Sequence, residues 1–134
     1  MKRVVLLCEP MDRWEAALAV NSSLFLSNAI RKDTIVYVNV EGRVIKIDGS
    51  KARRVYPDSE SLVGLFKAIL KGKKVPGVEV SLCPEIGEAW CPGKEVGEEV
   101  VIVPKCFGLP LTAELVALQI CLDRVLVGLS CPQR

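Results

Sequence analysis

The sequence predicts a single α/β domain, residues 1–134, with a mostly parallel β-sheet flanked by helices. Short apolar runs alternate along the chain with longer segments of helical spacing, which is the order that builds parallel sheets. Half of the residues are apolar, so the chain can bury a substantial core. The run EVVIV at residues 99–103 is typical of a parallel strand covered on both faces.

The amino-terminal half predicts a strand, a long helix and a β-hairpin. Residues 4–7 are an apolar run that precedes Glu-Pro, as expected for a buried strand. Asp12 has the side chain of an N-cap for a helix that extends to Ile30. Residues 35–40 alternate β-branched and aromatic side chains, and a Glu-Gly turn connects them to a second strand at residues 43–47.

The middle of the chain predicts one further helix and a short strand. Apolar side chains with helical spacing favour a helix at residues 62–71, with Asp58 or Ser59 as its cap and Gly72 at its end. Residues 78–82 are a strand candidate within an irregular stretch rich in proline and glycine.

The carboxyl-terminal part predicts strands on both sides of a helix. Residues 88–91 are a weak strand candidate, residues 111–122 a helix capped by Thr112, and residues 124–127 a final strand. Because ligands of parallel sheets bind at the carboxyl ends of the strands, we expect a site formed by the loop at residues 104–110 and by the tail from Gly128 onward.

Composition excludes several classes of function. The chain has no histidine, which excludes hydrolases of the Ser-His triad type and most zinc ligand sets. Its formal net charge of +2 argues against a strongly basic nucleic-acid binder but leaves room for a local basic face. No apolar run is long enough to span a membrane, and the amino terminus is more typical of a strand than of a signal peptide. We therefore expect a cytoplasmic protein.

The six cysteines have no metal-binding or redox spacing. No two of them are separated by two residues, so the simplest interpretation is small buried apolar side chains. Few asparagines and glutamines and many charged residues are typical of thermophiles, in which intracellular disulfides occur. Cys83 and Cys91 flank a turn-rich segment and are the pair to test for a bridge.

A compact charged cluster, Arg31-Lys32-Asp33, lies where the first expected helix meets a strand. Loops held by rigid elements often present functional side chains to ligands. Cations in a last helical turn are also common because they complement the helix dipole. Both interpretations stay open at this point.

The motifs around this cluster give the chain a recognisable pattern. The first is Ser-x-x-Ile-Arg-Lys-Asp at residues 27–33, and the second is Pro57-Asp58 followed by Ser61 at the start of a helix. The third is a strand, the tripeptide Gly-Leu-Pro at residues 108–110, a helix and the sequence VLVG. In this order the motifs resemble the archaeal tRNA pseudouridine N1-methyltransferases of the TrmY type, which belong to the SPOUT class of S-adenosylmethionine-dependent RNA methyltransferases.

The resemblance implies a SPOUT-like fold of the α/β-knot type with a truncated carboxyl end. The family usually has Gly-Asp-His where this chain has Pro104-Lys105-Cys106, and it continues after the last strand with a further helix. Here the sequence ends at Arg134, seven residues after the expected strand. The arginine that the family carries within its first helix also has no counterpart, since that stretch reads AALAV.

The resemblance implies S-adenosylmethionine as cofactor and two candidate catalytic carboxylates. Asp12 and Asp33 are candidates for removing the proton from the acceptor nitrogen, with a helix cap and an ion-pair partner as their respective structural alternatives. Trp90 has a structural alternative as a buried tryptophan. The expected cofactor-binding residues are Trp90, Gly108, Leu126, Gly128, Leu129, Ser130 and Cys131.

The resemblance also implies tRNA or another structured RNA as partner, and a homodimer. Cationic side chains would contact RNA phosphates, although a solvated basic surface explains them equally well. The first helix is apolar enough to supply a dimer interface. The expected RNA-binding residues are Arg13, Arg31, Lys32, Lys51, Arg53 and Arg54.

Three hypotheses of function follow. The leading one is a SPOUT-like tRNA methyltransferase, similar to the enzymes that methylate N1 of pseudouridine. The second is a degenerate, non-catalytic SPOUT-like domain that binds RNA or a protein partner. The third is an unrelated α/β domain in which the motifs match by chance.

Overall fold

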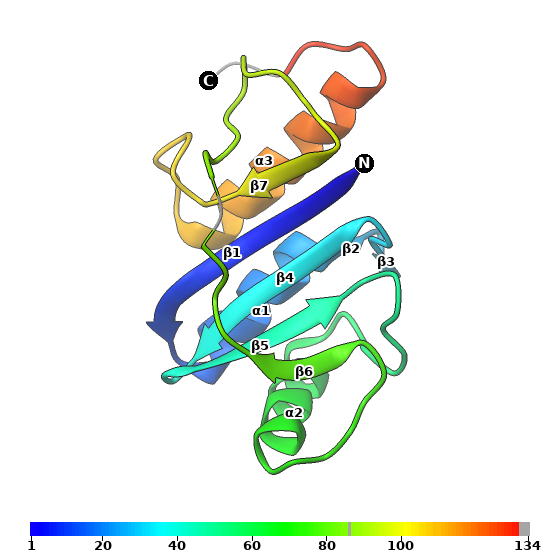
Figure 1. The fold of residues 1–134 in the computed structure, drawn as a ribbon, viewed down its shortest axis with the longest axis vertical. Coiled ribbons are helices and arrows are strands. Elements are labelled where there is room, and N and C mark those ends of the chain that lie inside the picture. The colour runs from blue at the N-terminus through cyan, green and yellow to red at the C-terminus, as the bar shows by residue number, and fades with distance from the viewer. Residues whose placement is uncertain (86, 132–134) are drawn as a thin grey trace.

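The computed structural model describes residues 1–85 and 87–131, which form two layers (Figure 1). A five-stranded sheet makes one layer, and α1, α2 and α3 lie together behind it as the second layer. The elements are β1 (Lys2–Met11), α1 (Arg13–Leu24), β2 (Phe25–Leu26), β3 (Ala29–Ile30), β4 (Thr34–Val40), β5 (Arg43–Asp48), α2 (Ser59–Leu70), β6 (Val78–Ser81), β7 (Glu99–Ile102) and α3 (Leu111–Leu126).

The predicted α/β class is confirmed. The prediction of a mostly parallel sheet is wrong, because the sheet is mixed. Its strand order is β6-β5-β4-β1-β7, with β1 parallel to both β4 and β7, and with β5 antiparallel to both β4 and β6. Glu41 and Gly42 both have positive φ, 52° and 97°, as a two-residue hairpin turn of type I′ requires. This turn makes β5 run back along β4, as the sequence predicts for the hairpin.

The core lies between the sheet and the helices. Alternate residues of the central strands, among them Val5 and Val36, are fully buried on the helical side. Ala16, Ala17 and Val20 of α1 are fully buried as well. Their small side chains allow α1 to pack closely on β4 and between α2 and α3.

The first helix is shorter than the sequence predicts. It ends at Leu24, and β2 and β3 form a small antiparallel hairpin in place of its expected last turns. Ser27 and Asn28 have positive φ, 49° and 65°, which a right-handed helix does not allow. Asn favours this conformation because its side chain tolerates the left-handed region.

The second helix agrees with the sequence. Asp58 is the N-cap of α2 and accepts a hydrogen bond from the Ser61 N–H at 2.9 Å. Gly72, with φ of 95°, ends the helix, as predicted. The strand predicted at residues 88–91 is wrong. The Trp90 backbone N–H donates one hydrogen bond of 2.7 Å to the Val101 carbonyl, beside β7.

The predicted final strand at residues 124–127 is wrong, because α3 continues to Leu126 and Val127 is its C-cap. Buried Leu118 and Leu122 continue toward Val125 with helical spacing, so core packing overrides the strand propensity of the sequence VLV. Gly128, with φ of 81°, ends α3 instead. The predicted Thr112 cap is also wrong, since Pro110 occupies the N-cap position.

The chain between β6 and β7 crosses the sheet face that the helices leave open (Figure 1). Two disulfides tie this crossover to the rest of the molecule, Cys8–Cys83 at its start and Cys91–Cys106 near its middle. A third, Cys121–Cys131, holds the tail against α3. Cys83 and Cys91, the candidate pair for a bridge, are therefore not bonded to each other. The interpretation of the cysteines as unbridged apolar side chains is also wrong. No helix of residues 1–85 and 87–131 has the length and apolar character needed to cross a membrane.

Candidate functional site

The charged junction Arg31-Lys32-Asp33 contributes two of its three side chains to an ion cluster beneath α3. Arg31 forms a two-point pair with Asp123, with Nη1–Oδ1 and Nη2–Oδ2 distances of 2.9 and 3.0 Å. Arg3 reaches Asp33 at 2.9 Å and Asp123 at 2.6 Å, and donates to the Gln119 side chain at 2.8 Å. Arg3 and Arg31 are only 4% and 9% exposed, and carboxylates pair with both guanidinium groups. Arg31 also lines a small hollow between α1 and α3.

The structure does not bring the two candidate catalytic carboxylates together. Asp12 caps α1 by accepting a 2.8 Å hydrogen bond from the Glu15 N–H, which confirms its structural alternative. Asp33 is the ion-pair partner of Arg3, which confirms the other alternative. The two carboxylates lie at opposite ends of β1, and strand geometry puts them roughly 30 Å apart.

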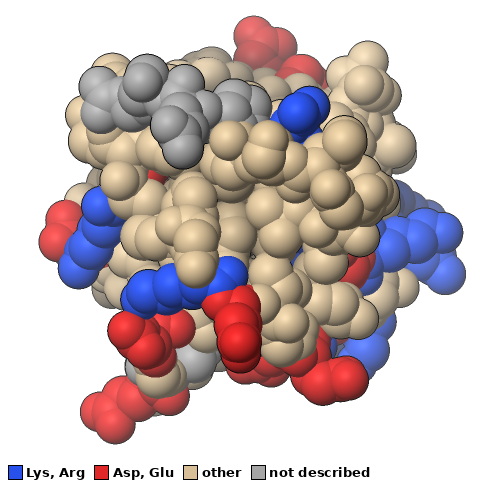
Figure 2. All heavy atoms as spheres, turned by 90° about the horizontal axis from the view of Figure 1, so that it is seen from above, with Lys and Arg blue, Asp and Glu red and all other residues tan. Residues whose placement is uncertain are grey.

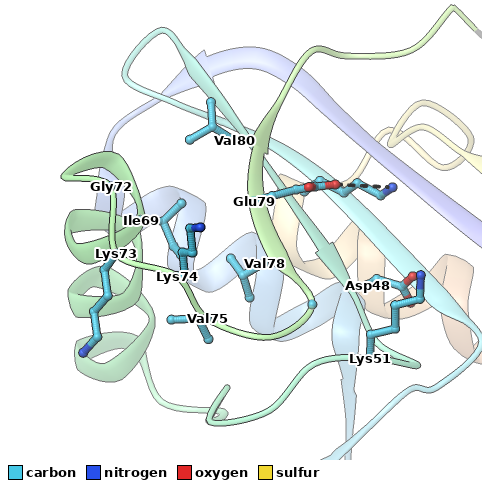
Figure 3. Close-up of a pocket in the computed structure, with 12 residues that line it drawn as sticks. Asp48, Lys51, Ile69, Gly72, Lys73, Lys74, Val75, Val78, Glu79 and Val80 are labelled. Atoms are coloured by element: carbon cyan, nitrogen blue, oxygen red, sulfur yellow. Dashed lines mark ion pairs between the residues drawn. The ribbon is translucent and has the colours of Figure 1, made fainter.

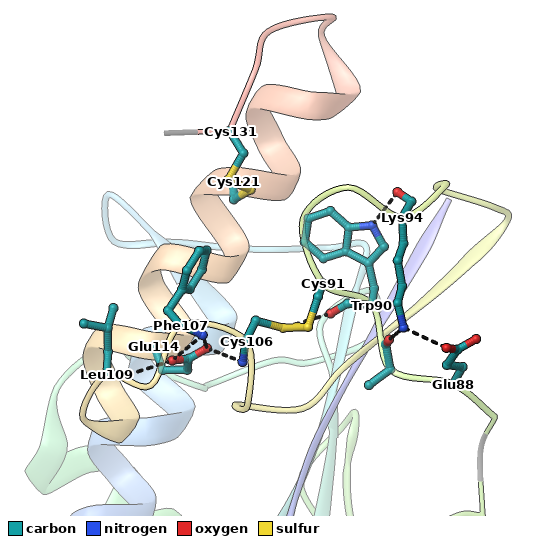
Figure 4. Close-up of a disulfide and its surroundings, with 11 residues drawn as sticks. Glu88, Trp90, Cys91, Lys94, Cys106, Phe107, Leu109, Glu114, Cys121 and Cys131 are labelled. Atoms are coloured by element: carbon teal, nitrogen blue, oxygen red, sulfur yellow. Dashed lines mark hydrogen bonds and ion pairs between the residues drawn. A yellow bond between two sulfur atoms is a disulfide. The ribbon is translucent and has the colours of Figure 1, made fainter. Parts of the chain in front are cut away.

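The expected cofactor-binding residues divide into separate groups. Gly108 precedes α3, whereas Leu126 lies in the last turn of this 16-residue helix, about 24 Å away. The tail then turns back along the helix, so that Cys131 is bridged to Cys121 and lines an apolar hollow with Phe107 and Leu109 of the loop. Trp90 is buried, 4% exposed, and its indole N–H donates to the Lys94 carbonyl at 3.1 Å (Figure 4). No single surface pocket of the described residues contains all three groups.

The loop before α3 wraps around the carboxylate of Glu114, a residue in the first turn of α3. Glu114, 1% exposed, accepts hydrogen bonds from the N–H groups of Cys106, Phe107 and Leu109 at 2.9–3.2 Å (Figure 4). Burial alone raises the pKa of Glu114, but these N–H donors outweigh it and hold the pKa below its ordinary value. The backbone donors that an anionic ligand would need here are thus already used by Glu114.

Among the hollows of the described residues, the one lined by the most cations lies at the opposite edge of the sheet, between α2 and β6. We call it the α2–β6 cleft; it has a volume of about 540 Å³ (Figure 3). Its apolar floor includes Ile69, Val75 and Val78, and two acidic residues, Asp48 and Glu79, also line it. Its cationic residues are Lys46, Lys51, Lys73 and Lys74.

The two carboxylates of the cleft are engaged locally. Asp48 accepts from the Ser50 N–H at 2.9 Å and from the Ser50 hydroxyl at 2.7 Å. Burial raises the pKa of Asp48, but these bonds and the charges of Lys51 and Lys46 lower it more, so Asp48 stays ionised at neutral pH. Glu79 lies 3.8 Å from the Lys46 amino group. Lys51, Lys73 and Lys74 have no such ion pair among the described residues.

A second hollow of about 300 Å³ adjoins the α2–β6 cleft and shares Lys73, Lys74 and Val75 with it. It adds Arg54 and Tyr56, and no acidic residue lines it. The two hollows together gather five cations on one edge of the molecule. By contrast, the face at the α3 end is largely free of charge over its centre (Figure 2).

The expected RNA-binding residues are only partly gathered in these hollows. Lys51 and Arg54 line these hollows. Arg53, next to Arg54 in the sequence, is exposed, and its backbone N–H donates to the Pro76 carbonyl. Arg13 lies at the far end of the sheet, where it pairs with Glu41 at 3.1 Å. Lys32 is exposed just before β4.

Sequence reasoning missed three cations of the cleft, Lys46, Lys73 and Lys74. The KGKK run after α2 was a visible signal for two of them. Lys46 carries no such signal, because only the pairing of β5 with β6 places it beside Glu79.

Comparison of the chain with protein-family models and with curated proteins finds no significant match.

Proposed function

We propose that this protein is an α/β domain that binds RNA, with the α2–β6 cleft and its adjoining hollow as the binding surface. The observation that carries this proposal is the concave grouping of five cations on one edge of a chain whose formal net charge is only +2. Phosphate contacts supply most of the affinity of RNA-binding proteins, and a basic groove follows the backbone. RNA is also the partner that the sequence resemblance implies.

The proposal favours binding without methyl transfer. Asp12 and Asp33 lie at opposite ends of the sheet, and both already have structural partners. The tail residues expected to hold the cofactor lie at the end of α3, with Cys131 bridged to Cys121. A transferase needs cofactor, base and substrate in one place, because positioning supplies most of the rate of such reactions.

The experiment is a fluorescence anisotropy titration of the oxidised protein with a labelled, unmodified tRNA transcript at several salt concentrations. If five cations contact phosphates, the plot of log K against log salt concentration should have a slope of roughly −3.5 to −4.5. A slope near zero, or no binding at low salt, contradicts the proposal.

S-adenosylmethionine-dependent methyl transfer, with a homodimer as the active species, is the second candidate function. The loop between β7 and α3 favours it, because that loop lies at the carboxyl end of the parallel strands, where ligands of such sheets bind. Trp14 and Leu18 of α1 and Val116 and Ile120 of α3 are exposed apolar side chains on which a second copy would pack. Calorimetric titration with S-adenosylmethionine tests this candidate: micromolar binding supports it, and no binding eliminates it.

A further inference from the structure

An aromatic side chain stands at the end of the basic surface. Tyr56 is 56% exposed in the segment between β5 and α2 and lines the smaller hollow beside Arg54. Lys73 and Lys74 line the same hollow. Single exposed aromatic residues are common on protein surfaces, but this one lies among three cations with no carboxylate lining the hollow.

The two hollows adjoin each other, and we call them together the track. They share Lys73, Lys74 and Val75, so an extended chain that leaves the α2–β6 cleft over these lysines would reach Tyr56. Figure 3 shows the Lys74 amino group beside Ile69, whereas the Lys73 side chain points away from Val78 and Glu79. The two consecutive lysines therefore serve different parts of the track.

From this arrangement we infer that the track binds single-stranded RNA, with phosphates on the lysines and one unpaired base stacked on Tyr56. The inference rests on the proposed function and adds the class of RNA. A base pair within a duplex has both faces covered by its neighbours, so an aromatic side chain can stack only on an unpaired or terminal base. Cationic grooves with interleaved aromatic side chains are the usual solution for single strands.

The test compares two labelled RNAs of equal length, an unpaired oligouridine and a stable hairpin duplex, by fluorescence anisotropy. Tyr56→Ala is expected to weaken binding of oligouridine about tenfold, since base–aromatic stacking has that magnitude. Tyr56→Phe keeps the ring and is expected to bind as the unchanged protein does. Val127→Ala removes an apolar side chain that is 72% exposed and lines neither hollow, and it is the control with no expected effect.

The outcomes separate this inference from the proposed function. Hairpin binding equal to or tighter than oligouridine binding, with no effect of Tyr56→Ala, overturns the inference and leaves RNA binding intact. Equal losses for Tyr56→Ala and Tyr56→Phe overturn the stacking role, because the ring is present in one of them. No binding of either RNA overturns the proposed function as well.

Discussion

Arg31 and Asp123 form a two-point ion pair that joins the loop before β4 to α3, across 92 residues of sequence. Arg3 of β1 contacts the same carboxylate at 2.6 Å, so Asp123 serves two arginines at once. The charged junction that the sequence marks as a candidate site is therefore the joint between the sheet and the last helix. It supports the fold, and the cations of the proposed RNA-binding surface lie elsewhere.

Asp123→Asn is expected to destabilise the protein by about 3 kcal/mol, because it leaves two buried arginines without their shared carboxylate. Guanidinium unfolding of the oxidised protein measures this difference. Glu41→Gln, which breaks the exposed pair with Arg13, is the control and should cost about 0.5 kcal/mol or less. Equal costs for the two variants would contradict the structural role of the cluster.

Acid is expected to destabilise the protein through Glu114 and Asp123. For both residues burial raises the pKa, but hydrogen bonds lower it more, from N–H groups at Glu114 and from Arg31 and Arg3 at Asp123. A carboxyl with a lowered folded-state pKa contributes stability above its unfolded pKa, about 4, and loses it as the pH falls through the folded-state value. Stability at pH 6 should therefore exceed that at pH 3, and Glu114→Gln should reduce the difference.

Reduction of the disulfides is expected to lower stability strongly. Cys8–Cys83 closes a loop with a sequence separation of 75, for which chain entropy gives about 4 kcal/mol. Cys8→Ser/Cys83→Ser should therefore lose more stability than Cys121→Ser/Cys131→Ser, whose separation is 10. Calorimetry with and without reductant measures both. Titration of free thiols in the denatured, unreduced protein should find none, and six reactive thiols would contradict the pairing.

Two glycine substitutions are expected to have opposite signs. A Cβ at Gly49 would clash with the backbone carbonyl oxygens of Arg31 and Thr34, so Gly49→Ala should destabilise the protein. Gly64 lies in α2 with open space around its Cα, and Gly64→Ala should stabilise the helix by about 0.5–1 kcal/mol. Thermal unfolding of the two variants distinguishes them, and a stabilised Gly49→Ala would contradict the packing described here.

The sequence predicts features whose signals are local. The Glu41-Gly42 turn and the Asp58 cap depend on a few adjacent residues, and both are present as predicted. The strand predicted at residues 124–127 fails because VLV fits a strand and the end of an apolar helix equally well. Only the packing of α3 on the core decides between these states.

Contacts between residues far apart in the sequence have no local signal. The partner of Arg31 is 92 residues away, and the partner of Cys8 is 75 residues away. In the same way, Lys46 and Lys74 come together only because β5 pairs with β6 beside α2. The lysines and arginines of the sequence indicate a basic surface, but the register of the sheet determines which of them lie together.

The most direct test of the α2–β6 cleft as an RNA-binding surface is the RNA affinity of Lys51→Glu/Lys74→Glu, which reverses two of its cations. Lys2→Glu/Lys105→Glu is the matched control, because it makes the same change in net charge at exposed positions outside both hollows. Anisotropy with the tRNA transcript at one salt concentration should show a loss of at least tenfold for the cleft variant and a small loss for the control. Equal losses would mean that net charge alone governs binding, and would contradict the cleft as the binding surface.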